Sequence, residues 1–248
     1  MIAPSWVTAF VDLPASGHPA GQQFWADVTG YAVSPPRGRH HEFTTLVPPV
    51  GDPHLRVQRL LDGPPRIHLD LHVDDLRAAA DRATALGAQQ VADLDDVVVL
   101  RSPGGLPLCL VGERLSTVAP PADWADGSRS IVDQVCLDIP ATGFDAECRF
   151  WADLTGWELS ASPGFPEFAR LARPTGVTVR FLLQRLGESS GSVRAHLDLA
   201  SSGRPEETLR HARLGATVER EHDHWTVLRD PAGMTYCITD RDPGLGAR

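Results

Sequence analysis

The sequence predicts an α+β protein of two tandem domains, each assembled from two modules with the order strand, helix and three strands (βαβββ). The first observation is the stretch Arg66–Leu71 (RIHLDL), which returns as Arg194–Leu199 (RAHLDL). The second is Phe24–Tyr31, which returns as Phe150–Trp157. Because such matches extend through most of the chain, they indicate a duplicated domain and not a short solenoid repeat. We therefore predict domains at 1–113 and 131–241, joined by a linker at 114–130 that is rich in Pro, Ala, Ser and Asp.

The histidine stretch reads as a strand, because apolar and polar residues alternate along it. Ile67, Leu69 and Leu71 form one face, and His68 and Asp70 form the other. A face that carries an imidazole and a carboxylate is expected to line a cavity or a wet groove. Any chemistry should therefore lie there, once in each half of the chain.

The remaining elements follow from periodicity and turn signals. In the first module we expect a strand at 6–14, a helix at 21–29 and strands at 31–33, 42–48 and 54–60. In the second module the histidine strand precedes a helix at 76–86 and strands at 97–100 and 106–111. Gly30 and Gly87 are typical helix ends. The tryptophans on the helices, Trp25 and Trp151, and Trp157 just after the second of them, are expected in the core.

The net charge and the residue composition exclude several classes of function. The formal net charge is −9, which argues against nucleic acid or an anionic membrane surface as a partner. All basic residues are arginines, so Schiff-base lysine and P-loop lysine chemistry are excluded. The N-terminal stretch has neither a basic region nor a long apolar run, and no apolar run reaches the length of a membrane span. We expect a cytoplasmic protein whose four cysteines are reduced.

Several motifs together resemble the vicinal oxygen chelate superfamily, the group of glyoxalases, bleomycin-resistance proteins and extradiol dioxygenases. They are the helix end Phe-Trp-Ala-Asp-x-Thr-Gly-aromatic, the strand His-Leu-Asp-Leu, the helix end Leu-Gly-Ala and the turn Asp230–Gly233 before a last strand. The chain particularly resembles the glyoxalase-like domain branch. The resemblance implies that two βαβββ modules curl into a cup-shaped mixed sheet with helices on its outer face. Four strand positions would reach the cup centre, where the metalloenzymes of the superfamily hold a divalent ion.

The resemblance assigns these four positions by residue. They are Thr8, Gln58, His68 and Cys109 in the first domain, and Gln134, Gln184, His196 and Cys237 in the second. The metalloenzyme pattern places a carboxylate on the last strand, where this chain has cysteine. Glutamine and threonine are weak neutral ligands, so we expect no obligatory metal or other cofactor. A Cys–His pair can still bind zinc or copper with help from Asp70 or Asp198, which leaves His196, Cys237, Gln134 and Gln184 as candidate ligands of a divalent metal.

Each candidate also has a purely structural interpretation. His68 and His196 either contact a ligand or act as acid–base groups, or else pair with the neighbouring aspartate. Cys109 and Cys237 have two interpretations. Each can act as a nucleophile, or it can be a small buried residue of its strand, and the second is the commoner role of a strand cysteine. Arg180 and Arg194 share the polar face and can meet an anionic ligand, although solvated arginine is the default. His72 extends the histidine face, but the second copy has Ala200 there, which favours a surface histidine.

Two functional hypotheses remain open. In the first, the protein binds a small organic molecule in a β-cup without an obligatory metal, as a sequestration or resistance protein does. In the second, it is a lyase, isomerase or dioxygenase that acts on an oxygenated small molecule in the second domain. There His196 and Cys237 are the catalytic candidates, with or without a metal. The expected partner is a small organic ligand, and the chain is a monomer or a homodimer.

Overall fold

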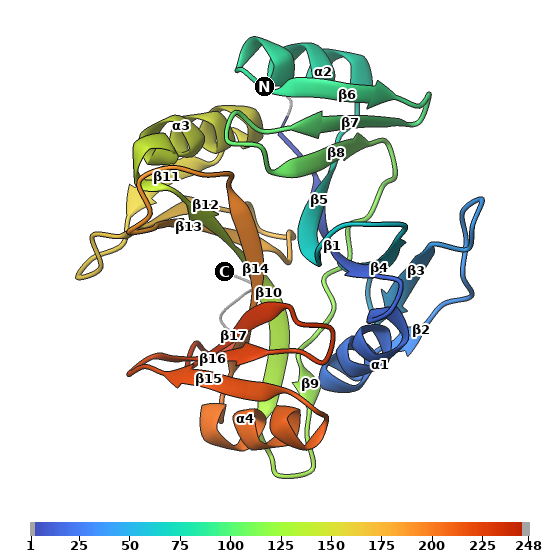
Figure 1. The fold of residues 1–248 in the computed structure, drawn as a ribbon, viewed down its shortest axis with the longest axis vertical. Coiled ribbons are helices and arrows are strands. Elements are labelled where there is room, and N and C mark those ends of the chain that lie inside the picture. Colours follow the sequence, from blue (N-terminus) through green and yellow to red (C-terminus); the bar gives the residue numbers. More distant parts are fainter. Residues whose placement is uncertain (1–2, 245–248) are drawn as a thin grey trace. The chain divides into compact units, whose positions relative to one another are not determined.

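The computed structural model describes residues 3–244, so Met1 and Ile2 of the predicted first domain lie outside the described residues. The first half of the chain contains β1 (Trp6–Pro14), α1 (His18–Thr29), β2 (Ala32–Val33), β3 (Phe43–Val47), β4 (Leu55–Leu60), β5 (Arg66–His72), α2 (Leu76–Ala85), β6 (Gln89–Asp93), β7 (Val97–Arg101) and β8 (Pro107–Val111) (Figure 1). The second half contains β9 (Ala122–Asp123), β10 (Arg129–Ile139), a 3₁₀ turn (Ala141–Gly143), α3 (Phe144–Thr155), β11 (Glu158–Ala161), β12 (Phe168–Ala172), β13 (Arg180–Arg185), β14 (Arg194–Ser201), α4 (Arg204–Arg213), β15 (Thr217–Glu221), β16 (Trp225–Arg229) and β17 (Thr235–Thr239).

The strands form two mixed sheets with the same internal order, which confirms the α+β class and the repeated βαβββ modules. The first sheet has eight strands in the order β2-β3-β4-β1-β5-β8-β7-β6. The second has nine strands, in the order β11-β12-β13-β10-β14-β17-β16-β15, with β9 paired to β10 off this path. The histidine strand of each sheet runs parallel to the last strand of its module, β5 beside β8 and β14 beside β17. This parallel pairing brings residues far apart in the sequence to the same level of the sheet.

The helix ends follow the sequence signals. Helices α1 and α3 both end at a glycine in the left-handed region, Gly30 with φ 70° and Gly156 with φ 69°, a conformation that costs glycine little. Helix α2 begins after Asp75, whose side chain accepts a hydrogen bond from the Ala78 backbone N–H. The same glycine signal therefore ends the corresponding helix in both halves of the chain.

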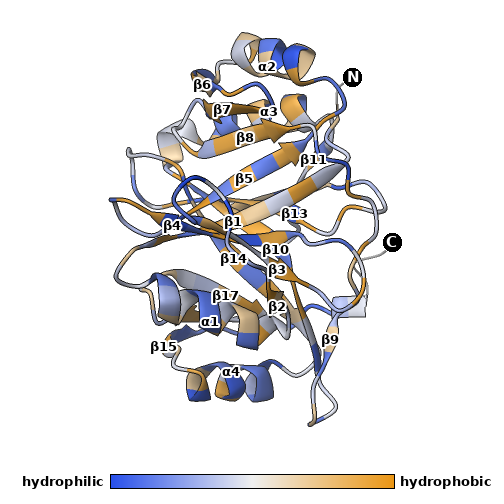
Figure 2. Cartoon of the chain, turned by 90° about the vertical axis from the view of Figure 1, so that its right-hand side faces the viewer, coloured by the Kyte–Doolittle hydropathy of each residue, from blue (hydrophilic) through white to orange (hydrophobic). Residues whose placement is uncertain are grey.

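The core lies between the helices and one face of each sheet. Trp25, Trp151 and Trp157 are 0%, 0% and 4% exposed, so the prediction that they belong to the core is confirmed. Along β5 hydrophilic and hydrophobic residues alternate, as Figure 2 shows by colour. The apolar side chains of that strand, Ile67, Leu69 and Leu71, are buried.

Backbone contacts divide the chain into two compact units. Unit 1 contains the residues up to Ala9, Ile67–Ser116 and Val135–Ala195, and unit 2 contains Phe10–Arg66, Thr117–Gln134 and the residues from His196 onward. Each unit therefore combines one βαβββ module from the first half of the chain with one from the second half. In unit 1 these are the modules of α2 and α3, and in unit 2 those of α1 and α4. The domain boundaries predicted from the sequence stay a prediction.

The position of one strand was not predicted from the sequence. The βαβββ order required a third strand in the second module, and the structure places it at β6, residues Gln89–Asp93. Four of its five residues are exposed, and its one large apolar side chain, Val91, is itself 53% exposed. Such a strand lacks the apolar alternation that reveals half-buried strands. Within residues 3–244, no helix is long and apolar enough to cross a lipid bilayer.

Candidate functional site

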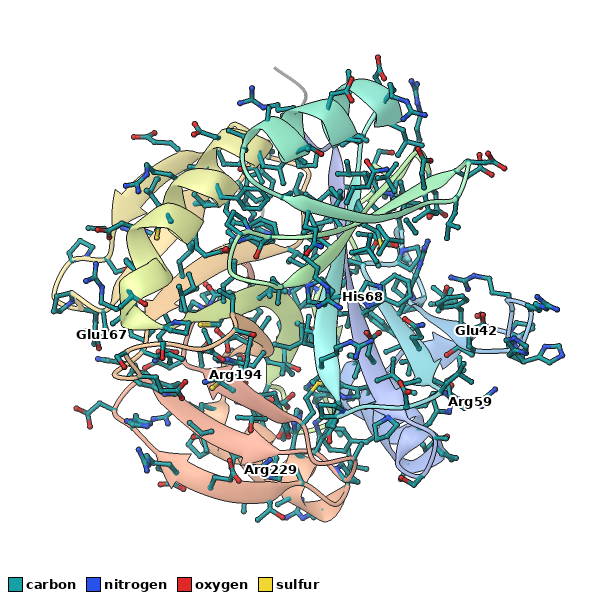
Figure 3. All side chains as sticks on the ribbon, turned by 45° about the horizontal axis from the view of Figure 1, so that its top comes forward. Glu42, Arg59, His68, Glu167, Arg194 and Arg229 are labelled. Atoms are coloured by element: carbon teal, nitrogen blue, oxygen red, sulfur yellow. The ribbon has the colours of Figure 1, made fainter. Side chains whose placement is uncertain are left out.

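The polar face of β5 is more enclosed than the wet groove that the alternation suggested. His68 and Asp70 are 8% and 5% exposed, and Figure 3 labels His68 on its strand. The Nε2 atom of His68 lies 3.7 Å from Oδ1 of Asp70. A carboxylate this deeply buried needs a compensating partner, and the imidazole beside it is placed to be one.

Cys109 joins these two side chains through the parallel pairing of β5 and β8. Its register partner on β5 is Asp70, so its thiol is brought to the level of the histidine and the carboxylate. One ligand atom from each of His68, Asp70 and Cys109 lies within 4.8 Å of the other two. All three residues belong to unit 1, and Cys109 is half-buried. Unit 1 thus holds a compact group of one nitrogen, one oxygen and one sulfur donor, which we call the His68 group.

The donor chemistry of the His68 group fits a divalent ion of the zinc type. Zinc takes imidazole, carboxylate and thiolate ligands at about 2.0–2.3 Å, so small rotamer changes would bring three atoms that are already within 4.8 Å onto one ion. A carboxylate and a thiolate together balance the charge of a divalent cation. The single histidine and the sulfur donor differ from the two-histidine, one-carboxylate set typical of non-heme iron oxygenases.

Thr8 has a partner that the sequence did not anticipate. Its Oγ1 lies 2.9 Å from Nε2 of His72, and Nδ1 of His72 lies 2.8 Å from the backbone oxygen of Glu113. A carbonyl oxygen only accepts hydrogen bonds, so Nδ1 carries the proton, and in a neutral ring Nε2 accepts from the threonine hydroxyl. Both side chains are 0% exposed. The prediction of a surface histidine at His72 is therefore wrong, because β1 and the segment after β8 cover this end of β5.

The matching residues of the second sheet are arranged differently. Nε2 of His196 lies 3.3 Å from Oδ1 of Asp198, and the side-chain amide of Gln134 donates a short hydrogen bond to Oδ2 of the same carboxylate. Cys237 is the register partner of Asp198. Among the described residues, His196 and Asp198 do belong to a donor group within 4.8 Å, but Cys237 is not part of it.

The other predicted site residues divide between the two units. Gln58 lies in unit 2, half-buried opposite Phe43. Gln184 lies in unit 1 and accepts a hydrogen bond from the Cys136 thiol at 3.7 Å. Arg180 is half-buried on β13 in unit 1. Arg194, labelled in Figure 3, is more exposed and bonds both oxygens of Glu188, at 2.9 and 3.1 Å. The surface carboxylate therefore balances the charge of Arg194.

Asp70 is the member of the His68 group that the four assigned positions leave out. The resemblance names only single positions on each strand, whereas Asp70 is found by alternation, two residues beyond His68 on the same face. Its pairing with Cys109 needs the register of β5 and β8, which local pattern does not supply. The site could be assembled only once both signals were combined.

Comparison with protein-family profiles shows to which family the chain belongs. A profile described as "Glyoxalase-like domain" matches residues 8–111 and again residues 134–239. The chain belongs to the glyoxalase-like domain family. This places it in the vicinal oxygen chelate superfamily, as the sequence motifs predicted. Among curated proteins the glyoxalase-like chain has no match.

Solved structures with the same fold include a Mn(II)-bound glyoxalase and a dioxygenase. The Mn(II)-bound glyoxalase from Novosphingobium aromaticivorans is 16% identical, with a TM-score of 0.66 over 96% of this chain and 83% of that one. A variant of homoprotocatechuate 2,3-dioxygenase from B. fuscum is 15% identical, with a TM-score of 0.65 over 97% and 72%. A mutant of 4-hydroxymandelate synthase from Streptomyces coelicolor is 15% identical, with a TM-score of 0.62 over 96% and 94%. At these identities the likeness establishes the fold, and the activity of the glyoxalase-like chain must be argued from its own residues.

Proposed function

We propose that this glyoxalase-like protein is a lyase or isomerase that binds an oxygenated small organic molecule beside a zinc-type divalent ion held by His68, Asp70 and Cys109. The observation that carries the proposal is the His68 group, whose three donor atoms lie within 4.8 Å of one another. Three protein ligands leave a coordination position for a substrate oxygen, as in catalytic zinc sites. When bound, the ion would polarise that oxygen as a Lewis acid.

The chain's own residues supply the rest of the site. Asp70 Oδ1 lies 3.7 Å from His68 Nε2, and Asp70 is the register partner of Cys109, so its carboxylate can help to orient both donors. Burial of His68 and Asp70 excludes bulk water and strengthens the electrostatic interactions of the group. Because zinc does not change its oxidation state, this donor set favours lyase or isomerase chemistry over dioxygenase chemistry.

A second function is favoured by a different observation. The His68–Asp70 distance of 3.7 Å allows these side chains to stabilise each other with no ion between them. In that case the polar face binds an organic ligand without metal, as a sequestration protein would. Metal binding separates the two candidates.

The decisive experiment measures metal content and the cobalt spectrum. Protein purified without chelator is analysed for metal, then the apoprotein is titrated with Co(II). We expect about one equivalent of metal per chain and an intense near-ultraviolet thiolate-to-cobalt band. Cys109→Ser should abolish the band, while Cys237→Ser, the same substitution at the equivalent position, should keep it.

The other outcomes are equally informative. A wild-type protein that retains no metal and gives no thiolate band would refute the metal site and leave the metal-free binder. A band lost in Cys237→Ser and kept in Cys109→Ser would move the site to the second sheet. Circular dichroism of each variant separates loss of binding from loss of folding.

A further inference from the structure

The His68 group lies at one end of a row of side chains that crosses the first sheet. Asp70 on β5 is the register partner of Cys109 on β8, and Cys109 is in turn the register partner of Val99 on β7. Val99 pairs with Ala92 on the edge strand β6. Paired residues point to the same face of a sheet, so the row has two polar members followed by two apolar ones. Figure 1 shows β5, β8, β7 and β6 side by side in this order.

The neighbouring residues of β7 and β8 widen the apolar part of this row. Val97 and Val99 point to the same face of β7, and Pro107 shares the face of Cys109 on β8. These three apolar side chains are half-buried, whereas Val98 and Leu100, on the opposite face of β7, are 3% and 0% exposed. The opposite face therefore belongs to the core, while this one stays partly open beside the donors. We call the open apolar surface the Val99 strip, and its members are Ala92, Val97, Val99 and Pro107.

The matching row of the second sheet does not end in an apolar surface. Its members, in the same register, are Asp198, Cys237, Val227 and Arg220. Arg220 takes the place of Ala92, and Thr235 takes the place of Pro107. These strands therefore form equally well with charged and polar residues at such positions, so the fold itself does not require an aliphatic strip beside the His68 group.

The charged residues of β6 and β7 lie at the edge of the strip or on the other face. Arg101 is exposed at the end of β7. Asp93 is the register partner of Val98, on the opposite face, and its carboxylate lies 3.2 Å from Nη1 of Arg77. A charged ligand tail on the strip would lose hydration against apolar side chains, whereas an aliphatic tail gains free energy from the same burial.

We propose that the substrate of this site carries an aliphatic chain, which binds along the Val99 strip while the oxygenated end of the molecule lies at the His68 group. The inference rests on the proposed function, because it takes the three donors as the place where the substrate oxygen binds. From Cys109 to Ala92 the row crosses two strand spacings, about 10 Å, which accommodates a chain of several carbon atoms. The members of the strip are aliphatic, so they pack against an alkyl chain and offer an aromatic ring no stacking partner.

Hydroxamates of different chain length test the proposal on the Co(II)-loaded protein. Their oxygens bind the ion and shift its visible spectrum, so a titration gives the dissociation constant of each compound. Each methylene buried on the strip should tighten binding by up to about fourfold. Hexanohydroxamate should therefore bind at least about tenfold more tightly than acetohydroxamate. Val99→Thr should weaken hexanohydroxamate binding about threefold to tenfold and leave acetohydroxamate binding unchanged.

Val227→Thr is the matched control. Val227 is half-buried and lies opposite Cys237, as Val99 lies opposite Cys109, and its replacement should change the affinity of neither hydroxamate.

Three results would overturn the proposal while the thiolate-to-cobalt band shows that the metal site exists. They are equal affinity for the two hydroxamates, tighter binding of benzohydroxamate than of hexanohydroxamate, and equal losses in Val99→Thr and Val227→Thr when circular dichroism shows both variants folded. A wild-type protein without the band would instead refute the metal site, and the proposal would fall with it. The band thus separates failure of the strip from failure of the proposed function.

Discussion

Replacing Glu147 by alanine should destabilise unit 1, and adding Ser102→Asp to that variant should restore most of the loss. Glu147 is a buried residue of α3. Its carboxylate accepts hydrogen bonds from the Ser102 hydroxyl at 3.0 Å, from the Gly104 backbone N–H and from Trp151 Nε1 at 2.9 Å. The carboxylate therefore joins the helix to the turn between β7 and β8.

In unit 2 the same connection is made from the opposite side. The carboxylate there belongs to Asp230, in the turn between β16 and β17. It accepts hydrogen bonds from Trp25 Nε1 at 2.9 Å and from the backbone N–H groups of Ala232 and Met234, each at 2.8 Å. The repeat position of Glu147 is Gly21, where an added Cβ would lie 2.6 Å from Leu13. Each unit thus has one carboxylate for the same tryptophan and turn, supplied by the helix in one and by the turn in the other.

The magnitude follows from the groups left unsatisfied. Glu147→Ala removes the acceptor of Gly104 N–H and Trp151 Nε1–H, and a buried donor without a partner costs about 1–3 kcal/mol. We expect a loss of about 3 kcal/mol, which corresponds to a fall in Tm of about 6–12 °C in a chain of this size. Ser102→Asp alone places a second carboxylate beside Glu147 and should cost roughly 2 kcal/mol. In the double variant the carboxylate introduced by Ser102→Asp would take the role that Asp230 has in unit 2, so the coupling should exceed about 3 kcal/mol.

Urea unfolding followed by circular dichroism measures all four proteins of this cycle. If the two positions can exchange the carboxylate, the double variant is more stable than either single variant. Additive losses would refute it, because they would mean that the two positions cannot exchange the carboxylate. Burial also raises the pKa of Glu147 against the opposing effect of its hydrogen bonds. A raised folded-state pKa makes the wild type relatively more stable below the ordinary glutamate pKa, and this gain should fade as the pH rises and be absent in Glu147→Gln.

Two further predictions concern buried polar pairs. Thr8→Val should lower the free energy of unfolding by about 1–2 kcal/mol, because it leaves Nε2 of His72 without its donor. Thr44→Val, whose hydroxyl bonds the less buried Gln22, should cost less in the same urea experiment, and equal losses would argue against the Thr8–His72 bond. Glu207 is a buried residue of α4. Burial raises the pKa of its carboxyl, but the hydrogen bonds that it accepts, above all the one from His211, have the larger effect and lower the pKa to about 2. The stability advantage of wild type over Glu207→Gln should therefore be full above the ordinary glutamate pKa and fade as the pH falls toward about 2. A difference that stays constant with pH, measured by urea unfolding, would contradict this.

The sequence was enough to predict the fold because the duplication repeats every structural signal. The helix ends at Gly30 and Gly156 and the two histidine strands lie where the pattern placed them. The sequence did not predict β6, because most of its residues are exposed and therefore show no alternation of apolar and polar side chains. It also could not assign the modules to compact units, since that depends on contacts such as those of Glu147 and Asp230 with distant parts of the chain.

The candidate site was only partly predictable for a related reason. Alternation alone put His68 and Asp70 on one face, and the family resemblance added Cys109. The structure brings these three together. The sequence predicted an exposed His72 because the second copy has alanine, Ala200, at the equivalent position. That difference does not show which neighbouring residues cover position 72 in the first copy. Burial of a strand residue depends on the strands beside it, and local sequence does not contain that information.

The two sheets have diverged in how they treat the same His-x-Asp strand. In the first sheet the β1 residue Thr8 bonds His72, and Asp70 stays within ligand distance of His68 and Cys109. In the second sheet position 200 is alanine, so Gln134 meets no histidine there and instead donates to Asp198. This hydrogen bond engages Oδ2 of the carboxylate, while Oδ1 lies 3.3 Å from Nε2 of His196. Gln134, the side chain that made the second domain look like the better site, therefore already engages one oxygen of Asp198, whereas no hydrogen bond of this kind from Thr8 reaches Asp70, because the Thr8 hydroxyl lies 2.9 Å from His72 Nε2.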